Sequence, residues 1–188
     1  MSLARVFLLF MTLPPVAMVA QQAGVPTEWE VQKVAQTIAA HAGRLQPLIT
    51  QIHPREWTAK GAPEAYIQQW ESVRTQAQSL KLSTDVLVHE PARLTATVDT
   101  YFRLQDLEGS LTSLIGGVRK YQNPALADLL TGMVSENNAS RQKLREYLVD
   151  LAALKEQEFK VIDAEAQRCR EAMTRSGRAA PAKKKQKQ

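Results

Sequence analysis

The stretch from residue 123 to residue 176, NPALADLLTGMVSENNASRQKLREYLVDLAALKEQEFKVIDAEAQRCREAMTRS, decides the fold of this chain. It opens with an asparagine cap and a first-turn proline, and no second proline follows before Ser176. Its apolar residues recur at steps of three and four, the period of an α-helix. A single helix over this stretch would be about 75 Å long. Polar residues 137–140 interrupt the pattern, so a continuous helix and a break there both stay open.

The second half of this stretch keeps the helical spacing among charged neighbours. Its apolar positions are Ala152, Phe159, Ile162, Ala166, Cys169 and Met173. Apolar steps of three and four flanked by charges are typical of coiled coils. A fourth helix so much longer than its neighbours must project or find a partner. We therefore predict that the C-terminal helix binds a protein partner or a second copy of the chain.

Three shorter helices are predicted ahead of it, over residues 27–52, 63–82 and 91–117. The first opens on Thr27 and Glu30, which have the spacing of a capping box. Its apolar positions continue through Pro47, so we expect a kink there and not an end. Gly116 and Gly117 are predicted to end the third helix, because glycine readily takes the left-handed conformation that closes helices.

The connections between these helices, residues 53–62 and 83–90, are short, which implies antiparallel neighbours. No strand pattern competes with the helical ones. The sequence therefore predicts an all-α, up-down-up-down bundle of four main helices with a long, coiled-coil-like C-terminal helix. Trp57, near Tyr66 and Trp70, is expected to plug one end of the core; a ligand patch is the alternative.

The two ends of the chain differ in composition from its middle. Residues 1–20 have one basic residue, a short apolar run, a proline pair and small residues, the order of a cleavable signal peptide. The apolar run is too short for a membrane-spanning helix, which needs roughly 20 apolar residues. We thus predict an exported protein, periplasmic or extracellular, with a helical domain over residues 21–176 and a disordered, lysine-rich tail over 177–188.

The positive charge of the chain belongs mainly to its end. Of 24 basic residues, Arg5 lies in the leader and six lie after residue 173, which leaves 17 against 19 acidic residues between them. A nucleic-acid-binding body is not supported, because such domains carry positive charge on a folded face. Each lysine of the tail contributes about 1 kcal/mol of binding free energy near an anionic membrane, so we predict at most weak contact with envelope surfaces. These lysines are Lys183, Lys184, Lys185 and Lys187.

No residue pattern points to catalysis, and we predict a non-enzymatic protein without a cofactor. The three histidines, His41, His53 and His89, are too far apart in sequence for a two-histidine metal face on one helix. The Glu-x-x-His motif of di-iron bundles does not occur on any predicted helix. A haem- or metal-binding bundle using His41 is kept as an alternative, since His41 lies beside the apolar positions of the first helix.

Cys169 is the one cysteine of the chain, which excludes a fold held by internal disulfides. Its place among the apolar positions predicts a buried, small apolar residue. An exported chain with a single cysteine also allows an intermolecular disulfide across two symmetric helices. Nucleophilic catalysis is disfavoured, because no partner base accompanies the thiol in the sequence.

These features lead to two ranked functional hypotheses besides the haem- or metal-binding bundle. The first is an exported, non-enzymatic helical protein that binds a protein or itself through its C-terminal helix. The second is a periplasmic chaperone-like or stress-binding protein that uses a groove between helices and the basic tail. With its leader, helical body and lysine-rich end, the chain resembles bacterial periplasmic proteins and, more loosely, small helical periplasmic chaperones. That resemblance implies an envelope role by analogy alone, since no motif accompanies it.

Overall fold

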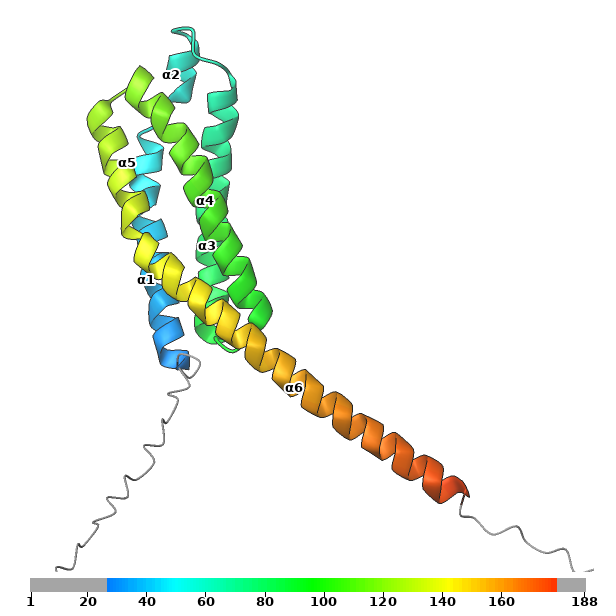
Figure 1. Cartoon of the computed structure of the whole chain (residues 1–188). Coiled ribbons are helices and arrows are strands. Elements are labelled where there is room, and N and C mark those ends of the chain that lie inside the picture. Colours follow the sequence, from blue (N-terminus) through cyan, green and yellow to red (C-terminus); the bar gives the residue numbers. More distant parts are fainter. Residues whose placement is uncertain (1–26, 179–188) are drawn as a thin grey trace, which may run out of the picture.

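The computed structural model describes residues 27–178, which form six α-helices and no strand (Figure 1). The helices are α1 (Glu28–Thr50), α2 (Pro54–Thr58), α3 (Ala65–His89), α4 (Leu94–Tyr121), α5 (Pro124–Glu136) and α6 (Asn138–Arg178). This confirms the predicted all-α bundle. The predicted signal peptide and the four tail lysines lie outside the described residues. None of the described helices is long and apolar enough to span a membrane.

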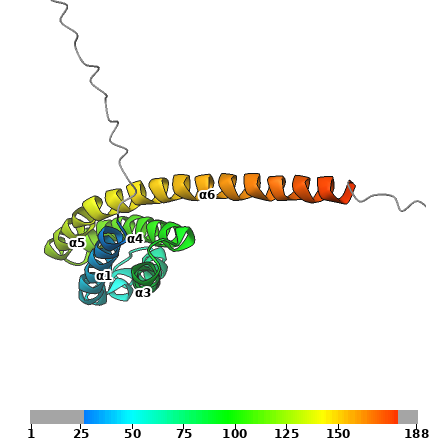
Figure 2. The same ribbon diagram turned by 90° about the horizontal axis from the view of Figure 1, so that it is seen from below.

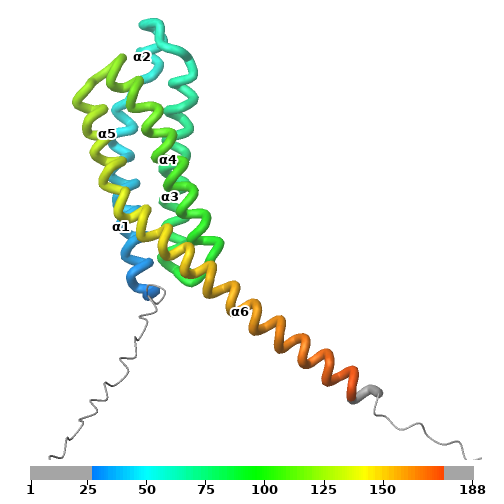
Figure 3. The backbone as a smooth tube through the Cα atoms, in the orientation of Figure 1, coloured from blue at the N-terminus to red at the C-terminus, as the bar shows by residue number. Residues whose placement is uncertain are grey.

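Four rods make the bundle: α1, α3, α4 and a fourth formed by α5 with the first part of α6 (Figure 3). Helices α1 and α3, α3 and α4, and α4 and α5 are packed neighbours. The core between them is made of aliphatic side chains that recur at helical spacing, such as Ile38, Leu45, Leu80, Leu104 and Leu111. Each of these five side chains is at most 2% exposed, so burial of one apolar face per helix stabilises the fold.

The long fourth helix bends at polar residues 137–140, where the sequence allowed either a continuous helix or a break. Asn137 separates α5 from α6 while keeping helical backbone angles, so the chain turns without forming a loop. Its own side chain is 4% exposed. The interruption of the apolar pattern at residues 137–140 therefore marks a bend between two helices. This outcome is intermediate between the continuous helix and the full break that the sequence allowed.

Two predicted helix ends are wrong. Residues 83–89 continue α3 and are not part of a connection, because Ser83, Thr84 and Leu87 are buried in the helical register. Helix α4 likewise runs through Gly116 and Gly117 to Tyr121. In both places the gain from burying another helical turn outweighs the weak local preference of polar residues or glycine to end a helix.

Gly117 has a packing role in place of the predicted helix-ending role. A Cβ atom added there would lie 2.6 Å from Cε1 of Tyr66 and 3.0 Å from Cζ3 of Trp57. The rings of Trp57 and Tyr121 stack with centroids 6.2 Å apart, and the Trp57 indole N–H donates to Oε1 of Gln122. Trp57 is 1% exposed, which confirms that it plugs this end of the core.

Candidate functional site

Helix α6 extends well beyond the bundle, and this projecting half, residues 152–178, is the most distinctive surface of the molecule (Figures 1 and 2). The last α6 side chain buried against the bundle is Leu151, at 2% exposed. Every residue from 156 to 175 is exposed. Phe159 and Ile162, large apolar residues, are 70% and 64% exposed. Side chains of this kind on one helix usually mark an interaction surface.

The exposed apolar residues of the projecting half form one stripe along the helix. We call Phe159, Ile162, Ala166, Cys169 and Met173 the apolar stripe. Together with Leu148, Ala152 and Lys155 they follow the alternating steps of four and three that define the a and d positions of a coiled coil. Only Lys155 departs from the apolar pattern, and its ammonium forms an ion pair with Glu158 at 2.9 Å.

The apolar stripe lies on the face of α6 that, in the first half of the helix, packs against the bundle. At 3.6 residues per turn, Ile162 and Cys169 lie within about 30° of Leu144 and Leu151 around the helix axis. Leu144 and Leu151 are 1% and 2% exposed, whereas Cys169 is exposed. One continuous face is therefore covered by α1 and α4 in its first half and left open in its second half.

Charged residues flank the apolar stripe unevenly. Glu156, Asp163 and Arg170 follow one side of it, at the e positions of the heptad. Glu158 and Glu165 follow the other side, at the g positions. One flank thus contains both signs of charge and the other only carboxylates, which constrains how a second helix can lie on the stripe.

Cys169 is exposed, so its predicted burial is wrong for the single chain. It lies in the apolar register as expected, but none of the other helices in residues 27–178 covers that part of α6. The thiol is accessible to another molecule, and an intermolecular disulfide stays a prediction.

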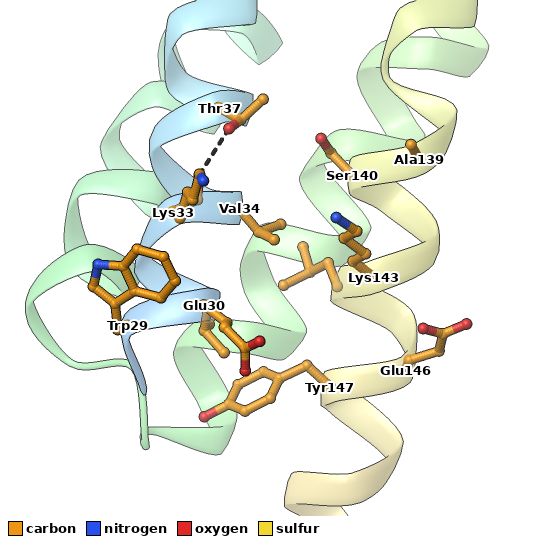
Figure 4. A pocket seen from close by; sticks show the side chains of 12 residues that line it. Trp29, Glu30, Lys33, Val34, Thr37, Ala139, Ser140, Lys143, Glu146 and Tyr147 are labelled. Atoms are coloured by element: carbon orange, nitrogen blue, oxygen red, sulfur yellow. Dashed lines mark hydrogen bonds between the residues drawn. The ribbon is translucent and has the colours of Figure 1, made fainter. Parts of the chain in front are cut away.

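A groove of about 590 Å³ lies between α1 and the first part of α6 (Figure 4). Its floor contains Val34 and Tyr147, and Trp29 stands at its edge with 66% of its surface exposed. The Lys33 ammonium lies 5.3 Å from the centroid of the Trp29 ring, a cation–π contact. The groove also has Lys143 on its α6 side, so it combines an exposed aromatic ring with two cations.

A buried ion pair joins α4 to α6 just after the bend. Glu108 is 6% exposed and accepts a hydrogen bond from the Arg141 guanidinium through Oε2, while its Oε1 has no partner. Burial raises the pKa of the Glu108 carboxyl, and the Arg141 charge opposes that shift. Arg141 also donates to Oδ1 of Asn138, so its guanidinium contacts α4 and the first turn of α6 together.

His41 is buried and fully engaged on the other side of the bend. Its Nε2 donates to the Met133 carbonyl at 2.6 Å, and its Nδ1 accepts from Arg44 at 2.8 Å. Burial lowers the pKa of the ring, in keeping with a neutral imidazole. Because both nitrogens have protein partners, His41 has no free nitrogen to bind haem iron or another metal.

The described part of the chain contains no cluster of potential metal-ligating residues. Among residues 27–178, no three His, Cys, Asp or Glu side chains are grouped as metal ligands would be. His53 and His89 lie at helix ends, away from His41. The sequence did not reveal the Glu108–Arg141 pair or the groove beside Trp29, because both arise between helices far apart along the chain.

No family model, curated protein or solved structure matches the chain.

Proposed function

We propose that this is an exported, non-enzymatic helical protein that binds a protein partner or a second copy of itself through the projecting half of α6. The observation that supports this most strongly is the exposure of the apolar stripe at coiled-coil spacing, with Phe159 and Ile162 each more than half exposed. Apolar surface of this kind gains free energy when another surface removes it from water.

The proposal of export rests on the order of charged, apolar and small residues in residues 1–20. An envelope location also gives the lysines after residue 182 a surface of anionic lipid or polymer to contact weakly. Fractionation of cells that produce the whole protein tests this part. A protein found with the cytoplasmic fraction, and still carrying residues 1–20, would contradict it.

The binding surface is tested by replacing stripe residues and measuring association. The double variant Phe159→Ser/Ile162→Ser removes two large apolar contacts, so we expect it to lose association that the unchanged protein shows. Sedimentation velocity from about 1 to 200 μM, with reductant present throughout, measures this independently of Cys169. Capture of envelope proteins by the two forms covers the case of a different partner.

The matched control changes the same helix on other faces. Val149 and Val161 are 60% and 59% exposed and lie outside the stripe. Val149→Ser/Val161→Ser should leave association unchanged. Equal loss in both double variants would mean that general helix hydrophobicity, and not the stripe, drives binding. A monomer that captures nothing at any concentration would contradict the proposal.

A second candidate function is chaperone-like binding in the groove between α1 and α6. The exposed ring of Trp29 above an apolar floor favours it, because aromatic side chains bind unfolded segments well. The protein should then suppress aggregation of a heated client protein, and Trp29→Ala should weaken that suppression. Leu129→Ala, at a 60% exposed position on α5, is the control and should have no effect.

A further inference from the structure

We infer that the partner of the projecting half is a second copy of this chain, and that the two projecting halves pair in antiparallel orientation. This inference rests on the proposed function and adds the identity and direction of the partner. It depends on three observations: the face on which the stripe lies, the length of helix left free, and the charges on its flanks.

The position of the bundle excludes a parallel pair. In a parallel, in-register pair, residues 138–151 of the second α6 would lie about 8–10 Å from those of the first, on the side of the stripe. That side is already occupied, because Leu144, Tyr147 and Leu151 pack there against the first copy's own bundle. The second helix would have to pass through α1 and α4 of the first copy.

An antiparallel pair avoids this overlap. The bundle of the second copy then lies beyond the C-terminal end of the first helix, at the far end of the pair. The free length fits this arrangement: with the twofold axis near residue 164, residue 151 of one helix lies opposite residue 177 of the other, and α6 ends at Arg178. Figure 2 shows the projecting half running clear of the bundle over that length.

The charges in and beside the stripe favour the same direction, chiefly through Lys155. In an antiparallel pair, e positions face e positions, so Arg170 meets Glu156 or Asp163 of the second copy in either of the two neighbouring registers. A parallel pair would place Lys155 against Lys155 between the helices and Glu158 against Asp163, although it would also pair Glu165 with Arg170. An antiparallel pair gives Arg170 of each copy a carboxylate partner and separates the two Lys155 ammonium groups, while placing Asp163 and Glu165 near their own equivalents when the axis lies near residue 164.

This direction has a consequence for Cys169. With the twofold axis near residue 164, Phe159 of the second copy lies opposite Cys169. The two Cys169 residues are then about 15 Å apart along the pair at 1.5 Å per residue, whereas a disulfide needs Cα atoms within about 7 Å. The predicted intermolecular disulfide therefore does not form in this register.

Spin labels on the outer face of α6 measure the direction. In a Cys169→Ser background, single labels are placed at Ala153→Cys and at Gln167→Cys, two exposed positions that share one heptad position facing away from the stripe. At 1.5 Å per residue, antiparallel pairing separates the two labels at 153 by about 30–45 Å along the helix, and those at 167 by less than about 10 Å. A parallel pair would give nearly equal distances at both positions.

The outcomes separate this inference from the proposed function. Sedimentation velocity of each labelled protein first establishes whether it is dimeric. A dimer with a much longer distance at 153 than at 167 supports the antiparallel pair. A dimer with equal distances overturns this inference and leaves self-association standing. A labelled and an unlabelled protein that both stay monomeric overturn the second copy as partner, and leave only binding to another protein.

Discussion

The two halves of α6 have an apolar face on the same side of the helix and opposite surroundings. Leu151 is 2% exposed where the helix crosses the bundle, while Ile162, three turns further on, is 64% exposed. The two side chains lie within about 30° of each other around the helix axis. The difference shows that an amphipathic pattern states which face of a helix gains from burial, but not which other surface buries it.

Shortening a buried side chain should lower the free energy of unfolding far more in the bundle than shortening an exposed one in the projecting half of α6. Leu104→Ala removes a fully buried side chain from the bundle core and should lower the free energy of unfolding by about 2–5 kcal/mol. Ile162→Ala, in the dilute monomer, should change it by less than about 0.5 kcal/mol. Urea unfolding followed by circular dichroism at low protein concentration measures both. Similar losses would show that the projecting half is packed in solution.

The next effect concerns the Glu108–Arg141 ion pair, which joins α6 to α4 of the bundle. Arg141→Ala leaves the buried Glu108 carboxylate without a counter-charge and should cost about 2 kcal/mol at neutral pH. The cost is below that of a fully buried pair because the Arg141 side chain is 38% exposed. Arg119→Ala breaks an exposed pair with Asp128 and should cost at most about 1 kcal/mol, as a control.

The pH dependence of that variant follows from the direction of the Glu108 shift. Burial raises the pKa of Glu108 in the folded state, so the folded protein prefers the protonated carboxyl. This contribution to stability is complete below the unfolded value of about 4.5 and is lost as the pH rises through the folded value. The cost of Arg141→Ala should therefore shrink in acid. A cost independent of pH would show that Glu108 is not the group left unpaired.

A smaller effect is expected at His41, on the bundle side of the bend. Burial lowers the pKa of His41, so the folded state prefers the neutral ring. Its contribution to stability is complete above about pH 6.5 and declines as the pH falls below that value. His41→Gln retains a donor for the Met133 carbonyl and should reduce this decline between pH 7.5 and 5.5. Urea midpoints at both pH values measure it.

The exposed His53 supplies the control for that measurement. His53→Gln should keep the same decline in stability as the unchanged protein, because the residue lies at the surface before α2. If both glutamine variants reduce the decline equally, the pH dependence does not come from burial of the His41 ring.

The smallest effect on the bundle is expected from breaking the projecting half itself. Gln157→Pro removes a helical hydrogen bond and costs the helix about 3 kcal/mol, so helical signal should fall. The urea midpoint of the bundle should stay unchanged, with Gln157→Ala as the control. A shifted midpoint would indicate that the bundle and the projecting half unfold as one unit.

Much of the fold could be predicted from local pattern. The four rods, the helix start at Thr27 and the proline entry to α5 follow from spacing and capping, which act over a few residues. The ends of α3 and α4 could not, since burial of Leu87 and Val118 by distant helices overrides local breakers. The Glu108–Arg141 pair and the groove beside Trp29 were missed for the same reason.

Local sequence pattern is enough to show that the C-terminal helix is long and that Phe159, Ile162 and Cys169 share one face, because helical period is a local property of the backbone. The bend at Asn137, and the burial of the apolar face as far as Leu151, depend on packing against the other helices. Those two features depend on how far the other helices reach along α6, and contacts between distant segments set that length.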